Sequence, residues 1–403
     1  MIKQLMLILL TSMFFLSGIT SNRIFDIPMK EVIFMLITFI TLYEIAKGNI
    51  HIYVREGLIF LGMVVFLFVW GIIGIVNGFS ETVVQHGVKV GTAIISILVL
   101  YTIIKSKYIR TERMYSLVKG MFWVGILFKF TVEIFYMLGF MTSIEIIEFI
   151  KDFSNVEVMS LGIADGYMMR IGTILDVLPL SIFPFLILNE CGMKRGVIWI
   201  CVLLYVYINF SRIYIIQVIV LSLLLFMPDR LSYPNIRKFI GMGLVVFFLL
   251  VLMTTSSINF YSGLEDRFVG VDAEVSDFYR YEQVLAFSEE IPKAYIFGNG
   301  LGAYIAGFIR NQAFPFLYEL EYLAIVYQFG FVGMLYIIWL YVLIFSSIPL
   351  KGLDGRYKML IITNFLFFLI RPVFNPMLLA SSSSMVLVCC FIFSEMKHRN
   401  LRG

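Results

Sequence analysis

The chain has 403 residues, of which 60% are hydrophobic and only 14% are charged, whereas charged residues make up roughly 25% of an average soluble domain. Its 31 basic and 27 acidic residues leave a formal net charge of +4. This composition excludes a soluble globular domain, and the scattered basic residues offer no surface for nucleic acid. The three histidines and four cysteines do not fall at metal-ligand or disulfide-framework spacing. We therefore expect no metal site and no cofactor.

Twelve apolar segments are each close to the roughly 20 residues that cross a bilayer. In chain order they are 4–20, 31–46, 57–77, 88–104, 116–139, 171–189, 196–210, 212–228, 238–255, 320–348, 358–373 and 379–396. The pattern predicts an all-α, polytopic bundle of about twelve transmembrane helices, with residues 1–403 forming a single membrane domain.

Basic residues mark alternate connections between these segments. They cluster at 47–55, 105–113, 194–195, 230–238 and 351–358, and in the tail at 397–402. Loops rich in Lys and Arg stay on the cytoplasmic side of a membrane. We therefore expect a multi-pass protein of the cytoplasmic (inner) membrane, with both termini in the cytoplasm.

The remaining connections lie on the predicted outer side, and the longest of them is the large loop 256–318. It carries too many charges to rest in hydrocarbon, and a long structured loop usually carries function. A helical pattern within it ends at Pro292. Its apolar patches at 294–297 and 303–309 predict helices that lie on or dip into the outer membrane surface.

Five arginines also fall on the predicted outer side, where the charge bias disfavours them. They are Arg170, Arg212, Arg280, Arg310 and Arg371. A single arginine at a helix end can be an interfacial anchor, because its charged tip reaches the headgroups while its stem stays in the membrane. Five together favour a phosphate-bearing substrate, which the planar guanidinium binds through paired hydrogen bonds.

Glycines and carboxylates of the large loop add further candidates. Gly298-Asn299-Gly300 permits a tight turn whose backbone N–H groups can face an anion, although an ordinary flexible loop has the same composition. Glu319 and Glu321 stand at the start of a predicted helix. A carboxylate there either stabilises the helix end or, facing Arg280 or Arg212, acts as a general base.

Taken in order, these landmarks resemble the O-antigen polymerase and ligase superfamily, which comprises the Wzy-type polymerases and the lipopolysaccharide ligases. The resemblance begins at residue 170, and Glu319 and Leu320 stand where the family commonly has His and Asn. The matching residues are Arg170-Ile171-Gly172-Thr173, which is one residue shorter than the family's pattern, Ser211-Arg212, Arg280, Pro292, Gly298-Asn299-Gly300, Tyr322-Leu323 and Gly330-Phe331-Val332-Gly333.

The resemblance implies a GT-C-like glycosyltransferase that joins undecaprenyl-pyrophosphate-linked oligosaccharide repeat units at the outer face of the membrane. Arg212 and Arg280 match arginines used on the donor pyrophosphate, and Glu319 or Glu321 takes the role of the base. Two alternatives stay open: a ligase that transfers the glycan to lipid A core, and a flippase or transporter, against which the lack of an internal repeat counts. A polysaccharide chain-length regulator is a candidate partner besides the membrane lipids.

Overall fold

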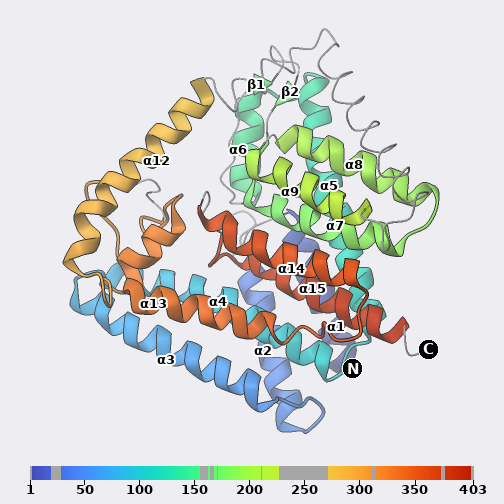
Figure 1. Ribbon diagram of the computed structural model, residues 1–403, viewed down its shortest axis with the longest axis horizontal. Helices are drawn as coiled ribbons and strands as arrows, with labels where there is room; N and C mark the ends of the chain where they lie inside the picture. Colours follow the sequence, from blue (N-terminus) through green and yellow to red (C-terminus); the bar gives the residue numbers. More distant parts are fainter. Residues whose placement is uncertain are drawn as a thin grey trace.

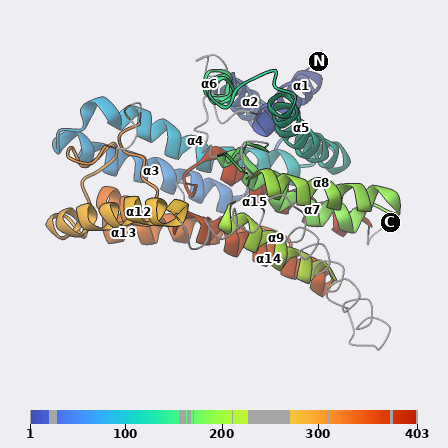
Figure 2. The same ribbon diagram turned by 90° about the horizontal axis from the view of Figure 1, so that it is seen from above.

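The computed structural model describes residues 2–19, 29–154, 162–163, 168–169, 171–209, 211–226, 271–309, 312, 314–373 and 377–400. This part of the chain is a bundle of helices with one two-residue antiparallel ladder (Figures 1 and 2). The long helices are α1 (Ile2–Ile19), α2 (Met29–Ala46), α3 (Val54–Val76), α4 (Ser80–Lys105), α5 (Thr111–Met137), α6 (Ser143–Ser154), α7 (Val177–Asn189), α8 (Met193–Asn209), α9 (Arg212–Phe226), α12 (Val271–Glu290), α13 (Glu321–Phe345), α14 (Gly355–Ile370) and α15 (Ser381–Asn400). The short elements are β1 (Gly162–Ile163), β2 (Met168–Met169), η1 (Ile174–Asp176), η2 (Ile291–Lys293) and η3 (Arg371–Val373).

Eleven of the twelve predicted apolar segments coincide with described helices, and the twelfth, 238–255, lies outside the described residues. Among the described helices, α1, α3, α4 and α13 are long and apolar enough to cross a membrane. Helices α7 and α9 are equally apolar but have only 13 and 15 residues, fewer than the roughly 20 that a bilayer requires. The all-helical class is therefore confirmed, with four helices that could cross a membrane by length and composition, whereas the count of twelve stays a prediction.

Helix α15 lies at the centre of the bundle, packed against α4, α5, α7 and α14. Every side chain from Met385 to Phe393 is buried, as expected for a helix that is apolar all round. Helix α3 instead leaves Phe60, Val64 and Phe68 exposed. In a membrane protein such an apolar outer face contacts lipid. The exposure of the side chains thus distinguishes α15, a core helix, from α3, a peripheral helix.

Loops that the charge pattern predicted to share one side of the membrane meet at one end of the bundle. Lys105 Nζ lies 2.6 Å from Glu56 Oε1, and Arg399 of the C-terminal tail lies 2.9 Å from Glu112 Oε1. The Arg399–Glu112 pair is largely exposed and contributes at most about 1 kcal/mol, whereas Glu56 is buried. The two pairs show which connections are neighbours.

A break in α13 ties the large loop to the bundle. Gly330 has a φ of 68° within the helix, a value that side chains other than glycine rarely adopt. Beyond it, the N–H of Phe331 donates to Tyr295 O at 2.8 Å and the N–H of Val332 to Ile296 O at 3.2 Å. A Cβ on Gly330 would stand 2.1 Å from Ile296 O, so only glycine allows this approach.

The neighbouring turn, residues 298–302, is held just as closely, and together with Gly330 we call it the glycine clasp. All five backbone N–H groups of residues 298–302 donate to acceptors in the protein. The bonds are Gly298 to Ala294 O (2.8 Å), Asn299 to Tyr327 O (2.9 Å), Gly300 to Gln328 O (2.6 Å), Leu301 to Trp70 O (2.8 Å) and Gly302 to His86 Nδ1 (2.9 Å). The clasp thus joins the large loop to α3, α4 and α13.

The apolar patches on either side of the clasp are not the predicted surface helices. Residues 294–297 and 303–309 form turns and irregular backbone. The carbonyls of Tyr295 and Ile296 accept from α13, so they are not available for a local helical ladder. That prediction was wrong because tertiary hydrogen bonds replaced local ones.

Substitution of Gly300 should destabilise the protein. Its φ is 92°, and a Cβ would lie 2.0 Å from the backbone nitrogen of Gly74, so Gly300→Ala requires α3 and the clasp to separate. We expect a loss of about 2 kcal/mol or more, seen as a lower thermal midpoint of the detergent-purified protein. Gly120→Ala in α5, where a Cβ meets nothing within 4 Å, is the control. Equal midpoints for the two variants would contradict the role of the clasp.

Candidate functional site

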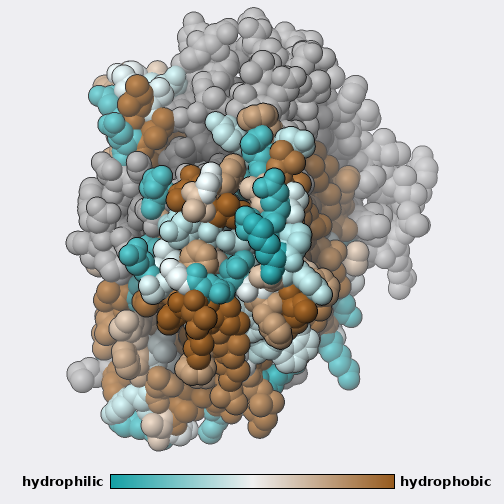
Figure 3. Space-filling model, turned by 90° about the vertical axis from the view of Figure 1, so that its left-hand side faces the viewer, coloured by the Kyte–Doolittle hydropathy of each residue, from teal (hydrophilic) through white to brown (hydrophobic). Residues whose placement is uncertain are grey.

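Arg280 of α12 and Glu319, two residues before α13, lie side by side. The Nε of Arg280 is 3.3 Å from Oε2 of Glu319. Glu319 is buried, with 5% of its surface exposed, whereas 20% of the Arg280 side chain remains accessible. Figure 3 faces this end of the molecule and shows hydrophilic residues gathered above a band of apolar side chains. The structure thus brings together two residues that the sequence suggested as catalytic partners.

One face of α12 holds this pair in place. Arg280, Gln283 and Phe287 follow at spacings of three and four residues and so lie on the same side of the helix. The buried Gln283 accepts a hydrogen bond at its Oε1 from the N–H of Leu320 at 3.1 Å. The Phe287 ring packs 4.9 Å from the ring of Tyr318. The helical spacing could have identified Gln283, which the sequence analysis missed.

Tyr318 belongs to the support of the pair. Its hydroxyl oxygen accepts a hydrogen bond from the N–H of Ile305 at 2.7 Å. Burial raises the pKa of Tyr318 to about 12, so the phenol stays protonated at neutral pH. A neutral, buried tyrosine of this kind is a structural group and not a base.

Glu321 has a different environment from Glu319. Its carboxylate is buried and accepts hydrogen bonds from the backbone N–H groups of Leu378 at 2.5 Å and Leu379 at 3.0 Å. It therefore anchors the segment before α15 to the start of α13. Of the two predicted bases, Glu319 is the one that faces Arg280, and we assign Glu321 a structural role.

The glycines predicted to bind an anion are also structural. The N–H groups of Gly298 and Gly300 donate to carbonyls of the protein, so neither is available to a phosphate. A Cβ on Gly298 would lie 2.4 Å from the backbone nitrogen of Gly330. We therefore correct their role from substrate binding to close contact between the large loop and α13.

Arg371 follows α14 and is one of the largest fully buried side chains among the described residues. Its Nη2 donates to Ser181 Oγ of α7 at 3.1 Å and to Gln217 Oε1 of α9 at 2.5 Å. The ring of Tyr214 lies 5.8 Å from its guanidinium carbon. The sequence placed this arginine among five at the outer surface, but the structure encloses it between three helices.

The other three arginines cannot be placed beside Arg280 or beside Arg371. Arg170 and Arg310 lie outside the described residues. Arg212 is the first residue of α9, but its side chain is not described. Arg280 and Arg371 have separate partners, so these two do not share a site. A single five-arginine cluster stays a prediction.

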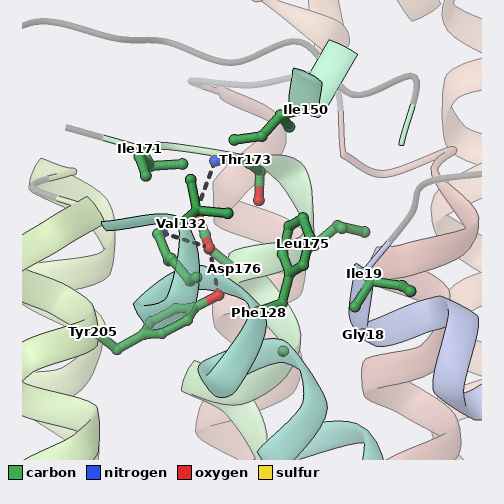
Figure 4. Close-up of a pocket in the computed structure, with 12 residues that line it drawn as sticks. Gly18, Ile19, Phe128, Val132, Ile150, Ile171, Thr173, Leu175, Asp176 and Tyr205 are labelled. Carbon is green, nitrogen blue, oxygen red and sulfur yellow. Dashed lines mark hydrogen bonds and ion pairs between the residues drawn. The ribbon is translucent and has the colours of Figure 1, made fainter. Parts of the chain in front are cut away.

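A buried ion pair that the sequence analysis did not identify lies between α5, α7 and α8 (Figure 4). Asp176 Oδ1 accepts from Lys129 Nζ at 2.8 Å and from the hydroxyl of Tyr205 at 2.5 Å, and its Oδ2 accepts from the N–H of Thr173 at 2.7 Å. These residues line a small pocket together with apolar side chains of α1 and α5. With so many partners, Asp176 is a structural centre that joins three helices.

Breaking this pair should destabilise the protein. Asp176→Asn or Lys129→Met leaves a charge buried without its partner, which typically lowers stability by about 3–5 kcal/mol. We expect the double variant to recover much of the loss, measured as the thermal midpoint in detergent. Lys119→Met, in the same helix but in a half-exposed pair with Glu190, should lower stability by less than about 1 kcal/mol. Similar losses for Lys129→Met and Lys119→Met would refute this assignment.

Comparison with known proteins identifies no relative of this chain. No protein-family model matches it, no curated protein matches it, and no solved structure matches it. The resemblance to the polymerase and ligase superfamily therefore stays a prediction from the order of the motifs. A function for the chain must be argued from the geometry of its own residues.

Proposed function

We propose that the chain is a membrane glycosyltransferase that polymerises a surface polysaccharide. It would transfer a glycan from one undecaprenyl-pyrophosphate carrier to a sugar hydroxyl of another lipid-linked repeat unit, at the outer face of the cytoplasmic membrane. The observation that carries the proposal is the Arg280–Glu319 pair, whose Nε and Oε2 lie 3.3 Å apart. A carboxylate and a guanidinium at one helix end are the two charges that this transfer requires.

The pair would act on the two halves of the reaction. The acceptor hydroxyl oxygen forms a bond to the anomeric carbon of the donor sugar, and Glu319 takes the hydroxyl proton as general base. The bond between that carbon and the diphosphate oxygen breaks, and its electron pair leaves with the diphosphate. Arg280 then stabilises the negative charge that develops on the leaving group.

The surroundings of the pair suit a substrate with a lipid tail and a polar head. Arg280, on α12, is partly accessible. Helix α13 begins two residues after Glu319 and exposes Phe331, Leu335 and Trp339. A polyprenyl tail can follow such an apolar surface within the bilayer while the diphosphate and the sugars stay above it.

Removal of either charge should abolish chain elongation. We expect Glu319→Gln and Arg280→Ala each to lower the rate by about 10²-fold or more, because general base catalysis and fixed positive charge each contribute factors of that size. The measurement is the length distribution of surface polysaccharide in cells that carry each variant, with the amount of membrane-inserted protein as reference. The control is Glu289→Gln, which changes an exposed carboxylate on α12, the helix that carries Arg280.

Long polysaccharide at wild-type levels in Glu319→Gln cells would rule out Glu319 as the base. Deletion of the gene distinguishes the two related transfer reactions. Loss of a polymerase leaves single repeat units attached to their acceptor, whereas loss of a ligase leaves none. Elongation by purified protein in detergent, with no compartment to cross, would exclude a pure transporter.

A further inference from the structure

Arg371 carries a buried positive charge that the described residues do not neutralise. The residue is 1% exposed. Its Nη2 is hydrogen-bonded, but Nε and Nη1 have no hydrogen-bond acceptor in the described part of the chain. Burying a charge without a partner lowers stability by several kcal/mol, so this guanidinium lacks an anion that would complete its surroundings.

The groups around Arg371 are fixed by their own hydrogen bonds. Gln217 is fully buried, and its Nε2 donates to Leu180 O and Ser181 Oγ, both at 3.3 Å. This orients its Oε1 toward Arg371, where it accepts from Nη2 at 2.5 Å. The guanidinium is therefore held in one position before any ligand binds, which lowers the entropy that binding must overcome.

The carboxylate of Asp176 is already paired with a cation. Asp176, whose charge acts on Tyr214 beside Arg371, forms its ion pair with Lys129 at 2.8 Å. Arg371 itself has no carboxylate partner in the described part of the chain. Electrostatic complementarity thus favours an anionic ligand at Arg371.

This centre is separate from the Arg280–Glu319 pair but lies close to it in the fold. The hydroxyl of Tyr322, three residues after Glu319, donates to Leu369 O at 2.6 Å, and Leu369 is two residues before Arg371. Helix α13 thus begins between the two arginines. A polymerase binds two lipid-linked substrates, and each of them carries a diphosphate.

We propose that Arg371 is a second anion site, which binds the diphosphate of a lipid-linked substrate, with Ser181 and Gln217 as its positioning residues. The choice of a polyprenyl diphosphate rests on the proposed function. The site lies between Ser181 of α7, Gln217 of α9 and the end of α14. Guanidinium bonds to phosphate oxygens are charge-assisted and about twice as strong as neutral ones.

The test is a binding titration of the full-length protein in detergent. Binding is measured as the rise in the thermal unfolding midpoint with ligand concentration. The probes are a short-chain polyprenyl diphosphate, the matching polyprenol without phosphate, and inorganic diphosphate. We expect the polyprenyl diphosphate to stabilise the wild type, and Arg371→Gln to bind it at least about tenfold more weakly. The matched control is Arg195→Gln, near the start of α8, where the exposed guanidinium donates to Glu190 O. This variant should bind the lipid as the wild type does.

A second readout is the stability of the ligand-free protein. Because Arg371→Gln removes a charge without a partner, its ligand-free midpoint should equal or exceed that of the wild type. A variant that unfolds, or whose midpoint falls sharply, would mean that another part of the chain pairs with Arg371, and this would overturn the proposal. Binding by Arg371→Gln within twofold of the wild type would overturn it too.

The probes also separate this inference from the proposed function. Equal affinity for inorganic diphosphate and the lipid would overturn the assignment to a lipid carrier. If the wild type elongates glycans while Arg371→Gln binds normally, only the second site is refuted. If Arg371 binds the lipid diphosphate but the protein never elongates a glycan, the polymerase is refuted and the anion site stands.

Discussion

Irregular backbone inside an apolar bundle is stable only if its N–H and C=O groups find partners within the protein, because lipid offers none. The glycine clasp meets this requirement: residues 298–302 donate all five of their N–H groups to the protein. The break at Gly330 frees N–H groups of α13 for loop carbonyls. Through these bonds the clasp fixes where α12 rests on α13, and hence where Arg280 meets Glu319.

Buried charge is the second constraint, and the bundle meets it in two ways. Asp176 is surrounded by three donors, among them Lys129, and this satisfied network joins three helices. Within the described residues, the hydrogen-bond partners of Arg371 are the neutral side chains of Ser181 and Gln217. A completed ion pair is a structural element, whereas a cation held in place by neutral groups has the properties of a binding site for an anion.

Local chemistry in the sequence was sufficient for part of the site. The spacing of Arg280, Gln283 and Phe287 specifies one helix face, and the pattern that ends at Pro292 matches the end of α12 and the turn η2. The roles of Glu319 and Glu321 could not be separated in this way, because both are carboxylates at one helix start. Contacts with Arg280 in one case and with Leu378 in the other distinguish them.

The sequence by itself determined the helical class, eleven of the described helices and the connections that meet at one end, because hydropathy and charge act locally along the chain. Only the tertiary structure decided what the glycines and arginines do. The N–H groups of Asn299 and Gly300 donate to carbonyls of α13, and Arg371 is enclosed by α7 and α9. Those partners lie far away in the sequence, so no local pattern specifies them.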